Sequence, residues 1–270
     1  MLDLLNIRHV VLDMDGTLYL GDTPFPDAQP FLAALSHLGI GYSFVTNNCS
    51  RSRAEYAQHL RHMGIHAPDE SIWTSAHATT FYLREHLPSI VRLFVLGTEG
   101  LHDEFRAAGF GIVDVEPEAV VVGFDNLLTY DRLAQTAYWV AKDLPYIATH
   151  PDRVCPTNRP IVLPDCGAIC ALLESATGRK PQAIPGKPNP VMLTTVIRAH
   201  NLTAPEVAMV GDRLYTDLRM ARNAGAFGVL TLTGETKRAD VDRCDAADRP
   251  ALVVDHLGQL ARLLQESRDG

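Results

Sequence analysis

The sequence predicts an α/β protein built around a largely parallel β-sheet. Two features of the 270 residues predict this class: short apolar runs of strand length recur along the chain, and segments whose apolar residues follow helical spacing lie between them. Because buried parallel strands need crossover helices, this alternation is typical of repeated βαβ units. The length is generous for one domain and comfortable for two.

The expected elements follow one another in a regular order. The apolar runs that predict strands are residues 9–12, 42–46, 92–96, 119–124, 146–149, 207–210, 228–232 and 252–254. Leucines and a phenylalanine at helical spacing predict amphipathic helices after the first run and at the end of the chain: Phe31, Leu32, Leu35 and Leu38, then Leu257, Leu260, Leu263 and Leu264. A further helix is expected over residues 53–63.

The composition limits the classes of partner. The formal charge of −8 argues against binding nucleic acid through its phosphates, because such binding needs basic patches. No apolar stretch approaches the length of a membrane span, and the first ten residues lack the basic and apolar regions of a signal peptide. We therefore expect a cytoplasmic protein with no nucleic-acid or membrane partner, whose five cysteines are reduced thiols.

The segment Asp13-Met14-Asp15-Gly16-Thr17 directly follows the first expected strand. Residues two apart in an extended chain point to the same side, so both carboxylates reach the edge where open α/β sheets bind ligands. Gly16 permits a sharp turn or a close approach of the backbone. Two acids, a glycine and a hydroxyl at a strand end suit phosphoryl transfer through an aspartyl phosphate. Taken alone, the segment is equally well explained as a solvated turn.

Three further segments bring polar groups to the same predicted edge. Thr46-Asn47-Asn48 ends the second strand and offers groups for phosphate oxygens, although a helix N-cap explains it better when it is taken alone. Lys187 stands just before Asn189-Pro190, which is typical of an N-cap and first helical residue, but a single lysine is usually a solvated surface charge. Gly211-Asp212 follows the strand at residues 207–210, and Asp217, one helical turn further on, also suits a helix start.

Together these segments bring four carboxylates toward one edge of the sheet: Asp13, Asp15, Asp212 and Asp217. Two unit charges about 4 Å apart repel by about 4 kcal/mol at an effective dielectric of 20, so a phosphate dianion could join them only with cations. Lys187 supplies one positive charge. Because every candidate ligand is an oxygen, Mg²⁺ is favoured over Zn²⁺ for the rest.

Two common nucleotide-binding patterns are incomplete in this chain. Gly109-Phe110-Gly111 lacks the third glycine of a dinucleotide-binding turn and does not open a helix. Gly186-Lys187 is followed by Pro188, where a Walker loop has Ser or Thr. Both observations argue against an NAD enzyme and a P-loop NTPase.

The four ordered segments resemble the motifs of haloacid dehalogenase superfamily phosphatases. Their wider sequence is similar to the NagD-like, 4-nitrophenylphosphatase group, which includes pyridoxal phosphate and phosphoglycolate phosphatases: Thr17-Leu18-Tyr19, Phe44-Val45-Thr46-Asn47-Asn48, Gly186-Lys187-Pro188, and Gly211-Asp212-Arg213-Leu214 with Thr216-Asp217. The resemblance runs from about residue 9 to residue 233. It implies an α/β fold with a Rossmann-like, doubly wound parallel-sheet core and an inserted α/β cap domain.

The resemblance also implies a role for each motif residue. Asp13 would be the nucleophile, and Asp15 the general acid that then becomes the general base. Asp13, the backbone carbonyl of Asp15, and Asp212 would hold Mg²⁺. Asp217 would orient metal-bound water or Lys187. The residues implied to bind the substrate are Thr46, Asn47, Asn48, Lys187, Arg213 and Thr216.

The interval between Thr46 and Lys187 is too long for a loop and contains its own expected strands and helices, so we expect a second domain. The resemblance implies that residues 87–182 form the cap, and that residues 1–86 and 183–270 form a discontinuous core. The substrate-facing loop of the cap would include His150 and Asp152. Relatives often have Asn at position 150, and a partly exposed polar loop residue explains His150 equally well. Relatives also often dimerise through the cap, so we expect a homodimer.

The activity that the resemblance implies is Mg²⁺-dependent hydrolysis of small phosphate monoesters through a phospho-aspartyl intermediate. The expected partner is a small phosphorylated metabolite, such as a nucleoside monophosphate, a sugar phosphate or pyridoxal phosphate, with 4-nitrophenyl phosphate as a model substrate. Asp15 favours phosphate esters, because family members that cleave carbon–halogen or carbon–phosphorus bonds lack this acid. A phosphomutase of the same superfamily and a non-catalytic phosphate-ligand-binding module are the alternatives.

Overall fold

The computed structural model describes residues 4–157 and 160–269. The chain divides into two compact units, and each is described by itself. The first, which we call the core unit, holds the described residues of 1–46, 57–72 and 187–270. The second, which we call the inserted unit, holds the described residues of 47–56 and 73–186. The chain passes between the units directly after Thr46 and directly before Lys187.

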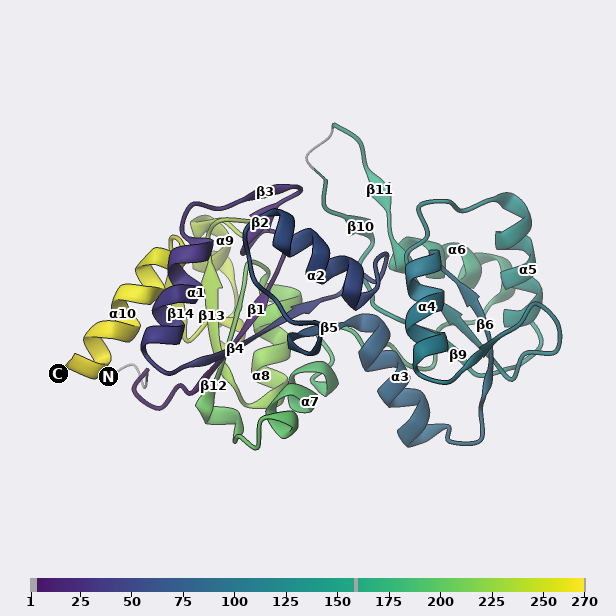
Figure 1. Cartoon of the computed structure of the whole chain (residues 1–270). Coiled ribbons are helices and arrows are strands. Elements are labelled where there is room, and N and C mark those ends of the chain that lie inside the picture. The colour runs from purple at the N-terminus through teal and green to yellow at the C-terminus, as the bar shows by residue number, and fades with distance from the viewer. Residues whose placement is uncertain (1–3, 158–159, 270) are drawn as a thin grey trace. The chain divides into compact units, whose positions relative to one another are not determined.

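A six-stranded sheet in the order β14-β13-β12-β1-β4-β5 organises the core unit (Figure 1). Its strands are β1 (His9–Asp13), β4 (Gly41–Thr46), β5 (Ile72–Thr74), β12 (Val207–Gly211), β13 (Phe227–Thr231) and β14 (Leu252–Val254). The pairings of β14 with β13, β13 with β12, β12 with β1, and β1 with β4 are parallel. All five residues of β1 are buried, which explains the continuous apolar run from Val10 to Leu12.

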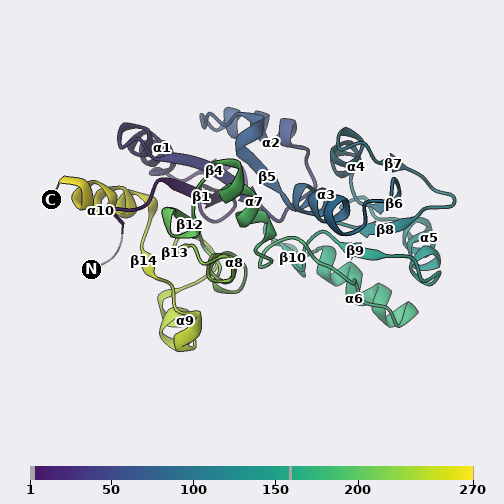
Figure 2. The same ribbon diagram turned by 90° about the horizontal axis from the view of Figure 1, so that it is seen from below.

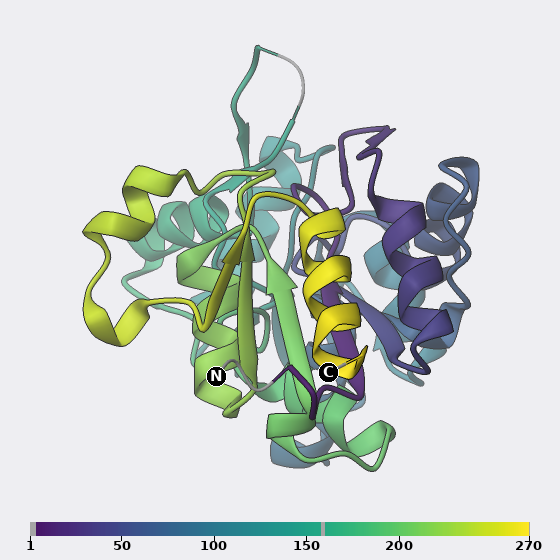
Figure 3. The same cartoon turned by 90° about the vertical axis from the view of Figure 1, so that its left-hand side faces the viewer.

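The core sheet is doubly wound about the boundary between β1 and β12. From β1 the chain adds β4 and β5 on one side, and later adds β12, β13 and β14 on the other. Because such crossovers are right-handed, the helices that join these strands cover opposite faces, as Figure 3 shows for the yellow and purple helices and the green ones. These helices are α1 (Ala28–His37) with α10 (Leu257–Asp269) packed on it, and α8 (Arg219–Ala224) with α7 (Val191–Ala199) packed on it. Ligands bind at such a reversal point.

Shorter elements complete the core unit. They are the hairpin β2 (Tyr19–Leu20) and β3 (Thr23–Pro24), the helix α9 (Arg238–Arg243), the π-helical turn η3 (Leu214–Leu218), and the 3₁₀ turns η1 (Asp69–Ser71), η2 (Ala204–Glu206) and η4 (Ala246–Asp248). Two elements cross the boundary between the units: the helix α2 (Arg53–His62) begins in the inserted unit and ends in the core unit, and β5 begins in the core unit at Ile72 and ends in the inserted unit.

The inserted unit has its own parallel sheet, in the order β7-β6-β8-β9 (Figure 2). The strands are β6 (Arg92–Leu96), β7 (Gly111–Ile112), β8 (Ala119–Val122) and β9 (Tyr146–Ala148). The other elements are α3 (Ser75–His86), α4 (Glu99–Ala107), α5 (Tyr130–Val140), α6 (Cys166–Thr177) and the two-stranded β10 (Val154–Cys155) and β11 (Leu163–Pro164).

Alternate residues of β6 enter two different hydrophobic cores. Leu93 and Val95 pack in one core with residues of α3 and α4, among them Leu83 and Phe105. Phe94 and Leu96 pack in a second core with residues of α5 and α6. Since successive side chains of a strand point to opposite faces, both faces of this sheet are buried, and residues 93–96 of the strand are all apolar.

The eight predicted strands are confirmed, with small differences at their ends. The run at residues 119–124 stops being a strand at Val122, and the N–H of Gly123 still donates to the carbonyl of Leu96 at the end of β6. The helix expected from Pro190 begins one residue later, at Val191, whose N–H is accepted by the Asn189 side chain at 3.0 Å. In the described part of the chain, no helix has both the length and the apolar character needed to cross a membrane.

Candidate active site

Two aspartates end neighbouring parallel strands at the reversal point of the core sheet. Leu12 of β1 is paired with Val210 of β12. Asp13 and Asp212 therefore lie at the same edge of the sheet, one residue apart in register. Their exposed fractions are 7% and 2%. The sequence therefore identified two carboxylates that the fold buries side by side.

Gly16 is required by both its conformation and its surroundings. Its φ is +87°, a region that favours glycine, and a Cβ at this position would lie 2.6 Å from Oδ2 of Asp212. This confirms the prediction that the backbone turns sharply and approaches another group here. The half-buried Asp15 precedes this turn, and its N-terminal neighbour Met14 is fully buried.

Lys187 joins two of the carboxylates. Its Nζ donates to Oδ1 of Asp13 at 2.5 Å and to Oδ1 of Asp217 at 2.7 Å, and the residue is 3% exposed. Burial alone would lower the pKa of Lys187, but the two carboxylates more than offset it and raise the pKa above its ordinary value. The lysine is therefore a buried, permanently charged ammonium and not a solvated surface residue.

The turn η3 holds Asp217 against the end of β12. Asp217 Oδ2 accepts the backbone N–H of Arg213 at 3.2 Å and the hydroxyl of Thr216 at 3.4 Å. A Cβ on Gly211 would lie 2.4 Å from Cβ of Asp217, so only glycine lets the turn pack this closely. The Arg213 guanidinium lies 3.0 Å from Oε2 of Glu235.

The carboxylates outnumber the cation that accompanies them. One ligand oxygen from each of Asp13, Asp212 and Asp217 lies within 4.8 Å of the other two. Burial raises the pKa of Asp13 to about 6, although Lys187 opposes this shift. Burial, followed by the charge of Asp13, raises the pKa of Asp212 to about 8. At neutral pH the cluster therefore lacks positive charge.

A divalent cation fits this donor set. Within the described residues, the buried Oδ1 of Asp212 accepts no hydrogen bond. An unpaired buried carboxylate oxygen is costly unless a cation or donor satisfies it. All the candidate donors are oxygens, which hard cations of the Mg²⁺ and Ca²⁺ class prefer.

Thr46 lies at the same edge of the sheet on the other side of β1. It ends β4 and follows Val45, which is paired with Asp13, and it is 6% exposed. This placement follows from parallel pairing, as the sequence predicted.

A supporting loop after β13 was not identified from the sequence. The N–H of Glu235 donates to Oδ2 of Asp212 at 2.6 Å, and the Thr233 hydroxyl donates to the carbonyl of Gly16 at 2.7 Å. A Cβ on Gly234 would lie 2.0 Å from Oδ2 of Asp212. The available signal was a Thr-Gly-Glu segment directly after a strand that ends at the same sheet edge.

Asn47 and Asn48 belong to the inserted unit and form hydrogen bonds within it. Nδ2 of Asn47 donates to both carboxylate oxygens of Asp152, at 3.3 and 3.2 Å. Oδ1 of Asn48 accepts the N–H of Ser50 at 2.9 Å. The first contact joins two residues that the sequence had proposed for substrate binding.

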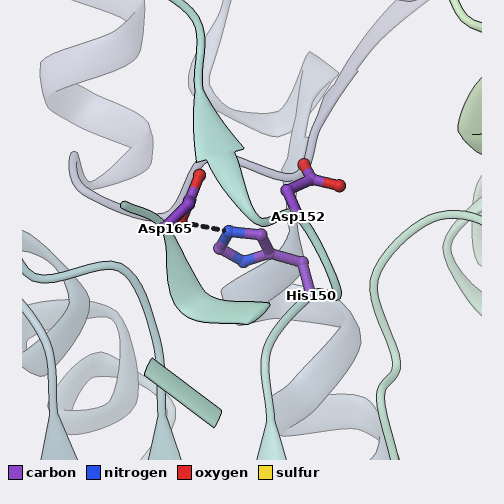
Figure 4. A group of neighbouring side chains, drawn as sticks. All are labelled: His150, Asp152 and Asp165. Atoms are coloured by element: carbon purple, nitrogen blue, oxygen red, sulfur yellow. Dashed lines mark hydrogen bonds and ion pairs between the residues drawn. The ribbon is translucent and has the colours of Figure 1, made fainter. Parts of the chain in front are cut away.

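His150 is fully buried in the inserted unit, so its interpretation as a partly exposed loop residue is wrong. Nε2 lies 2.8 Å from Oδ1 of Asp165 (Figure 4). Nδ1 lies 2.8 Å from the Thr149 hydroxyl. Burial opposes protonation, but the charge of Asp165 raises the pKa of His150 well above its ordinary value. Sequence alone did not reveal Asp165 as the partner, because the two residues are 15 positions apart on different elements.

Comparisons with known proteins agree in family and activity. Residues 10–111 match the family model described as haloacid dehalogenase-like hydrolase, and residues 184–260 match a related model of the same kind of hydrolase. The chain is 33% identical to the ribonucleotide monophosphatase NagD of Escherichia coli over 88% of its own length and 92% of the relative. It is 35% identical to the acid sugar phosphatase of Staphylococcus aureus, over 86% and 88% respectively.

Solved structures show the same similarity. The 4-nitrophenylphosphatase of Thermotoga maritima superposes with a TM-score of 0.92 at 40% identity, and the alignment covers 97% of this chain and 99% of that one. The glycerol phosphate phosphatase of Mycobacterium tuberculosis, solved in complex with magnesium, superposes with a TM-score of 0.88 at 32% identity over 96% and 78% of the two chains.

Proposed function

We propose a mechanism for this chain, which belongs to the haloacid dehalogenase-like hydrolases and is a phosphatase of phosphate monoesters, in which Asp13 is the nucleophile. The observation that carries the proposal is the buried contact of Lys187 with both Asp13 and Asp217, beside the unpaired oxygen of Asp212. Such a site can neutralise a phosphoryl group and the carboxylate that attacks it.

The first half of the reaction transfers the phosphoryl group to the protein. A carboxylate oxygen of Asp13 forms a bond to phosphorus while the bond from phosphorus to the ester oxygen breaks. Asp15 acts as the general acid and gives its proton to the departing oxygen, which leaves as an alcohol. Lys187 pairs with the phosphoryl oxygens and holds Asp13 in the attacking position.

The second half returns the phosphoryl group to water. Asp15, now a carboxylate, takes a proton from the attacking water while the water oxygen bonds to phosphorus. The bond between Asp13 and phosphorus breaks and releases inorganic phosphate. Asp217 fixes the position of Lys187 throughout, because it accepts a hydrogen bond from the ammonium at 2.7 Å.

Phosphatases of this family need a metal ion, and we propose that this chain binds Mg²⁺. Asp13, the backbone carbonyl of Asp15, and Asp212 would hold it. When bound, Mg²⁺ supplies positive charge to the phosphoryl oxygens. The oxygen-only donor set and the unpaired buried oxygen of Asp212 support this assignment.

The remaining polar groups are proposed to bind the phosphate. Thr46 lies at the sheet edge beside Asp13, and Asn47 and Asn48 follow it directly in the chain. Arg213 and Thr216 flank Asp217 on and beside η3. Their hydroxyl, amide and guanidinium donors suit phosphate oxygens.

We propose that residues 87–182, all of which the inserted unit contains, form a cap that selects the leaving group. Asp152 and His150 lie in its candidate specificity loop. Relatives named for ribonucleotide, sugar and glycerol phosphates support a search among nucleoside monophosphates, sugar phosphates and pyridoxal phosphate.

We also propose that the chain forms a homodimer through the inserted unit. Exposed apolar side chains lie on and near α5: Leu127 and Tyr130 are 72% and 83% exposed. Val115, 72% exposed, follows Asp114, whose carbonyl accepts a hydrogen bond from Trp139 of α5. Tyr130→Asp should convert a dimer to a monomer in light scattering at unchanged circular dichroism, and a wild-type monomer would contradict the proposal.

The activity is tested with purified protein and 4-nitrophenyl phosphate. Wild-type protein should release 4-nitrophenol with Mg²⁺ and should lose this activity in EDTA. Asp13→Asn should abolish turnover while its circular dichroism and melting temperature show an intact fold. Turnover by Asp13→Asn would refute the nucleophile. A panel of phosphate monoesters, with release of inorganic phosphate as the readout, would then rank the substrates.

A further inference from the structure

A buried polar network surrounds His150 in the inserted unit. His150 and Asp165 are 0% and 3% exposed, and their side chains are joined directly at 2.8 Å (Figure 4). Asp165 is also the N-cap of α6, where its Oδ1 accepts the N–H of Cys166 at 2.6 Å. The imidazole Nδ1 faces two hydroxyls, those of Thr149 at 2.8 Å and Ser75 at 3.4 Å. Both ring nitrogens of His150 therefore have hydrogen-bond partners.

Stability alone does not explain a buried ion pair. Removing two charges from water costs free energy that their attraction only partly recovers, and apolar replacements of such pairs are often neutral or stabilising. The 2.8 Å contact between His150 Nε2 and Asp165 Oδ1 is a direct hydrogen bond, so an ion does not separate these two groups. The function of the pair must be sought in the segments that it contacts.

One of these segments leads to Thr46. The Ser75 hydroxyl, which faces His150, donates to the backbone carbonyl of Asn47 at 2.6 Å. Asn47 is bonded in the chain to Thr46, the last residue of the core unit before the crossing. The network therefore fixes a peptide that is directly attached to a proposed phosphate-binding residue.

The other segment leads to Lys187. Gly186 donates its N–H to the carbonyl of Thr149 at 2.9 Å, directly before His150 in the chain. A Cβ on Gly186 would lie 2.8 Å from Cβ of His150 and 2.8 Å from Oδ1 of Asn47. The backbone of Gly186 is thus packed against both, and the next residue is Lys187, the ammonium that holds Asp13.

We propose that His150 and Asp165 form a positioning pair for phosphate-ester hydrolysis, which fixes the backbone of Asn47 and Gly186 and, through them, the attached Thr46 and Lys187. The pair does not touch the substrate. The inference rests on the proposed function of Lys187 and Thr46. It predicts that loss of the pair slows the transfer of the phosphoryl group more than it weakens substrate binding.

The test compares Asp165→Asn, His150→Asn and the double variant with wild-type protein, using 4-nitrophenyl phosphate at saturating Mg²⁺ and well below each melting temperature. Because a misplacement of about 1 Å can reduce the rate about 100-fold, we expect kcat to fall at least about tenfold in each single variant. KM should change less than about threefold, since none of the side chains that are proposed to bind the phosphate is removed. The half-maximal Mg²⁺ concentration should be unchanged. The double variant should be no slower than the slower single variant, because each substitution already breaks the same contact between residues 150 and 165.

His102→Asn is the matched control. His102 is a half-buried histidine of the same unit, whose Nε2 bonds the backbone carbonyl of Val95, and it contacts neither Asn47 nor Gly186 through any bond of its ring. We expect this variant to keep kcat within about twofold, as for an ordinary structural substitution. A purely structural role of His150 would lower the melting temperature and leave kcat per folded molecule unchanged, and that result would overturn the proposal.

Ser75→Ala keeps the inference testable if the buried pair cannot be altered without unfolding. It removes only the hydroxyl between His150 and the Asn47 carbonyl and should reduce kcat about threefold to tenfold with KM preserved. An unchanged kcat in Ser75→Ala would overturn the link to Asn47. Failure of the proposed function is distinguishable, because it would appear as an inactive wild type or an active Asp13→Asn protein.

Discussion

At the scale of single residues, Lys187 is the group on which the charge balance of the core site depends. Its ammonium is 3% exposed and contacts two carboxylates that are themselves buried. A buried cation that is paired on both sides is stable, whereas each carboxylate without it would be an uncompensated buried charge. In the proposed mechanism the same contact also positions Asp13 for attack.

We expect Lys187→Met to lower kcat about 100-fold or more, because a charge that acts on the transferring phosphoryl group is lost. In EDTA the variant should lose about 3 kcal/mol of its free energy of unfolding, since Asp13 and Asp217 are left unpaired. Denaturant titration and steady-state kinetics measure the two effects. The control is Lys180→Met, which replaces a lysine whose side chain is 74% exposed and which should change neither quantity. A Lys187→Met protein with kcat within tenfold of wild type would contradict the proposed role.

At the scale of elements, the site depends on how closely η3 packs on the end of β12. Strand β12 stops at Gly211 and η3 starts three residues later, so Asp217 returns toward the strand end. The π-helical winding of η3 places Asp217 where its Oδ2 accepts the N–H of Arg213. Such π-turns are uncommon and occur frequently at functional sites.

Gly211→Ala should disturb this packing. The new Cβ would lie 2.4 Å from Cβ of Asp217, so η3 must shift, and we expect a loss of about 1–3 kcal/mol in the free energy of unfolding together with a lower kcat. Gly111→Ala in β7 is the control, because its Cβ would meet other atoms only at ordinary van der Waals distances, 3.7 Å from the carbonyl oxygen of Val91 and 4.0 Å from Cγ of Arg92. Equal kcat in both variants would show that the contact of η3 with Gly211 does not position Asp217.

At the scale of the whole molecule, folding brings together carboxyl groups whose protonation depends on pH and on metal binding. The pKa values of Asp212 and Asp13 are raised to about 8 and about 6, above the ordinary value of a carboxyl group. At these two groups the folded, metal-free protein therefore binds more protons than the unfolded chain between about pH 4 and pH 8. In this window these two groups lower the free energy of unfolding as the pH rises.

We expect Mg²⁺ to reverse this loss. The ion binds carboxylates only in their deprotonated form, so the increase in melting temperature that it causes should be larger at pH 8 than at pH 5. Thermal denaturation with and without Mg²⁺ at the two pH values measures the increment. In Asp212→Asn the increment should be small at both pH values. An increment in the wild type that is equal at both, or larger at pH 5, would contradict a site built on Asp13 and Asp212.

Much of the fold and of the core site was readable from the sequence. The apolar runs at residues 9–12 and 207–210 are strands because they are buried on both faces, and a parallel sheet brings their carboxyl ends to one edge. Asp13 and Asp212 were therefore placed together by local pattern and a general rule of topology. The φ of +87° at Gly16 likewise follows from a turn that must begin at the strand end.

What the tertiary structure decided depends on contacts between segments that are distant in the chain. Glu235 and Asp212 are 23 residues apart, and only the folded loop shows that one donates its N–H to the other. His150 contacts Asp165, the N-cap of α6, and Ser75, the first residue of α3, which come from distant parts of the chain. Local sequence sets periodicity and turn chemistry, whereas the pairing of a buried charge is set by packing among elements that no local pattern encodes.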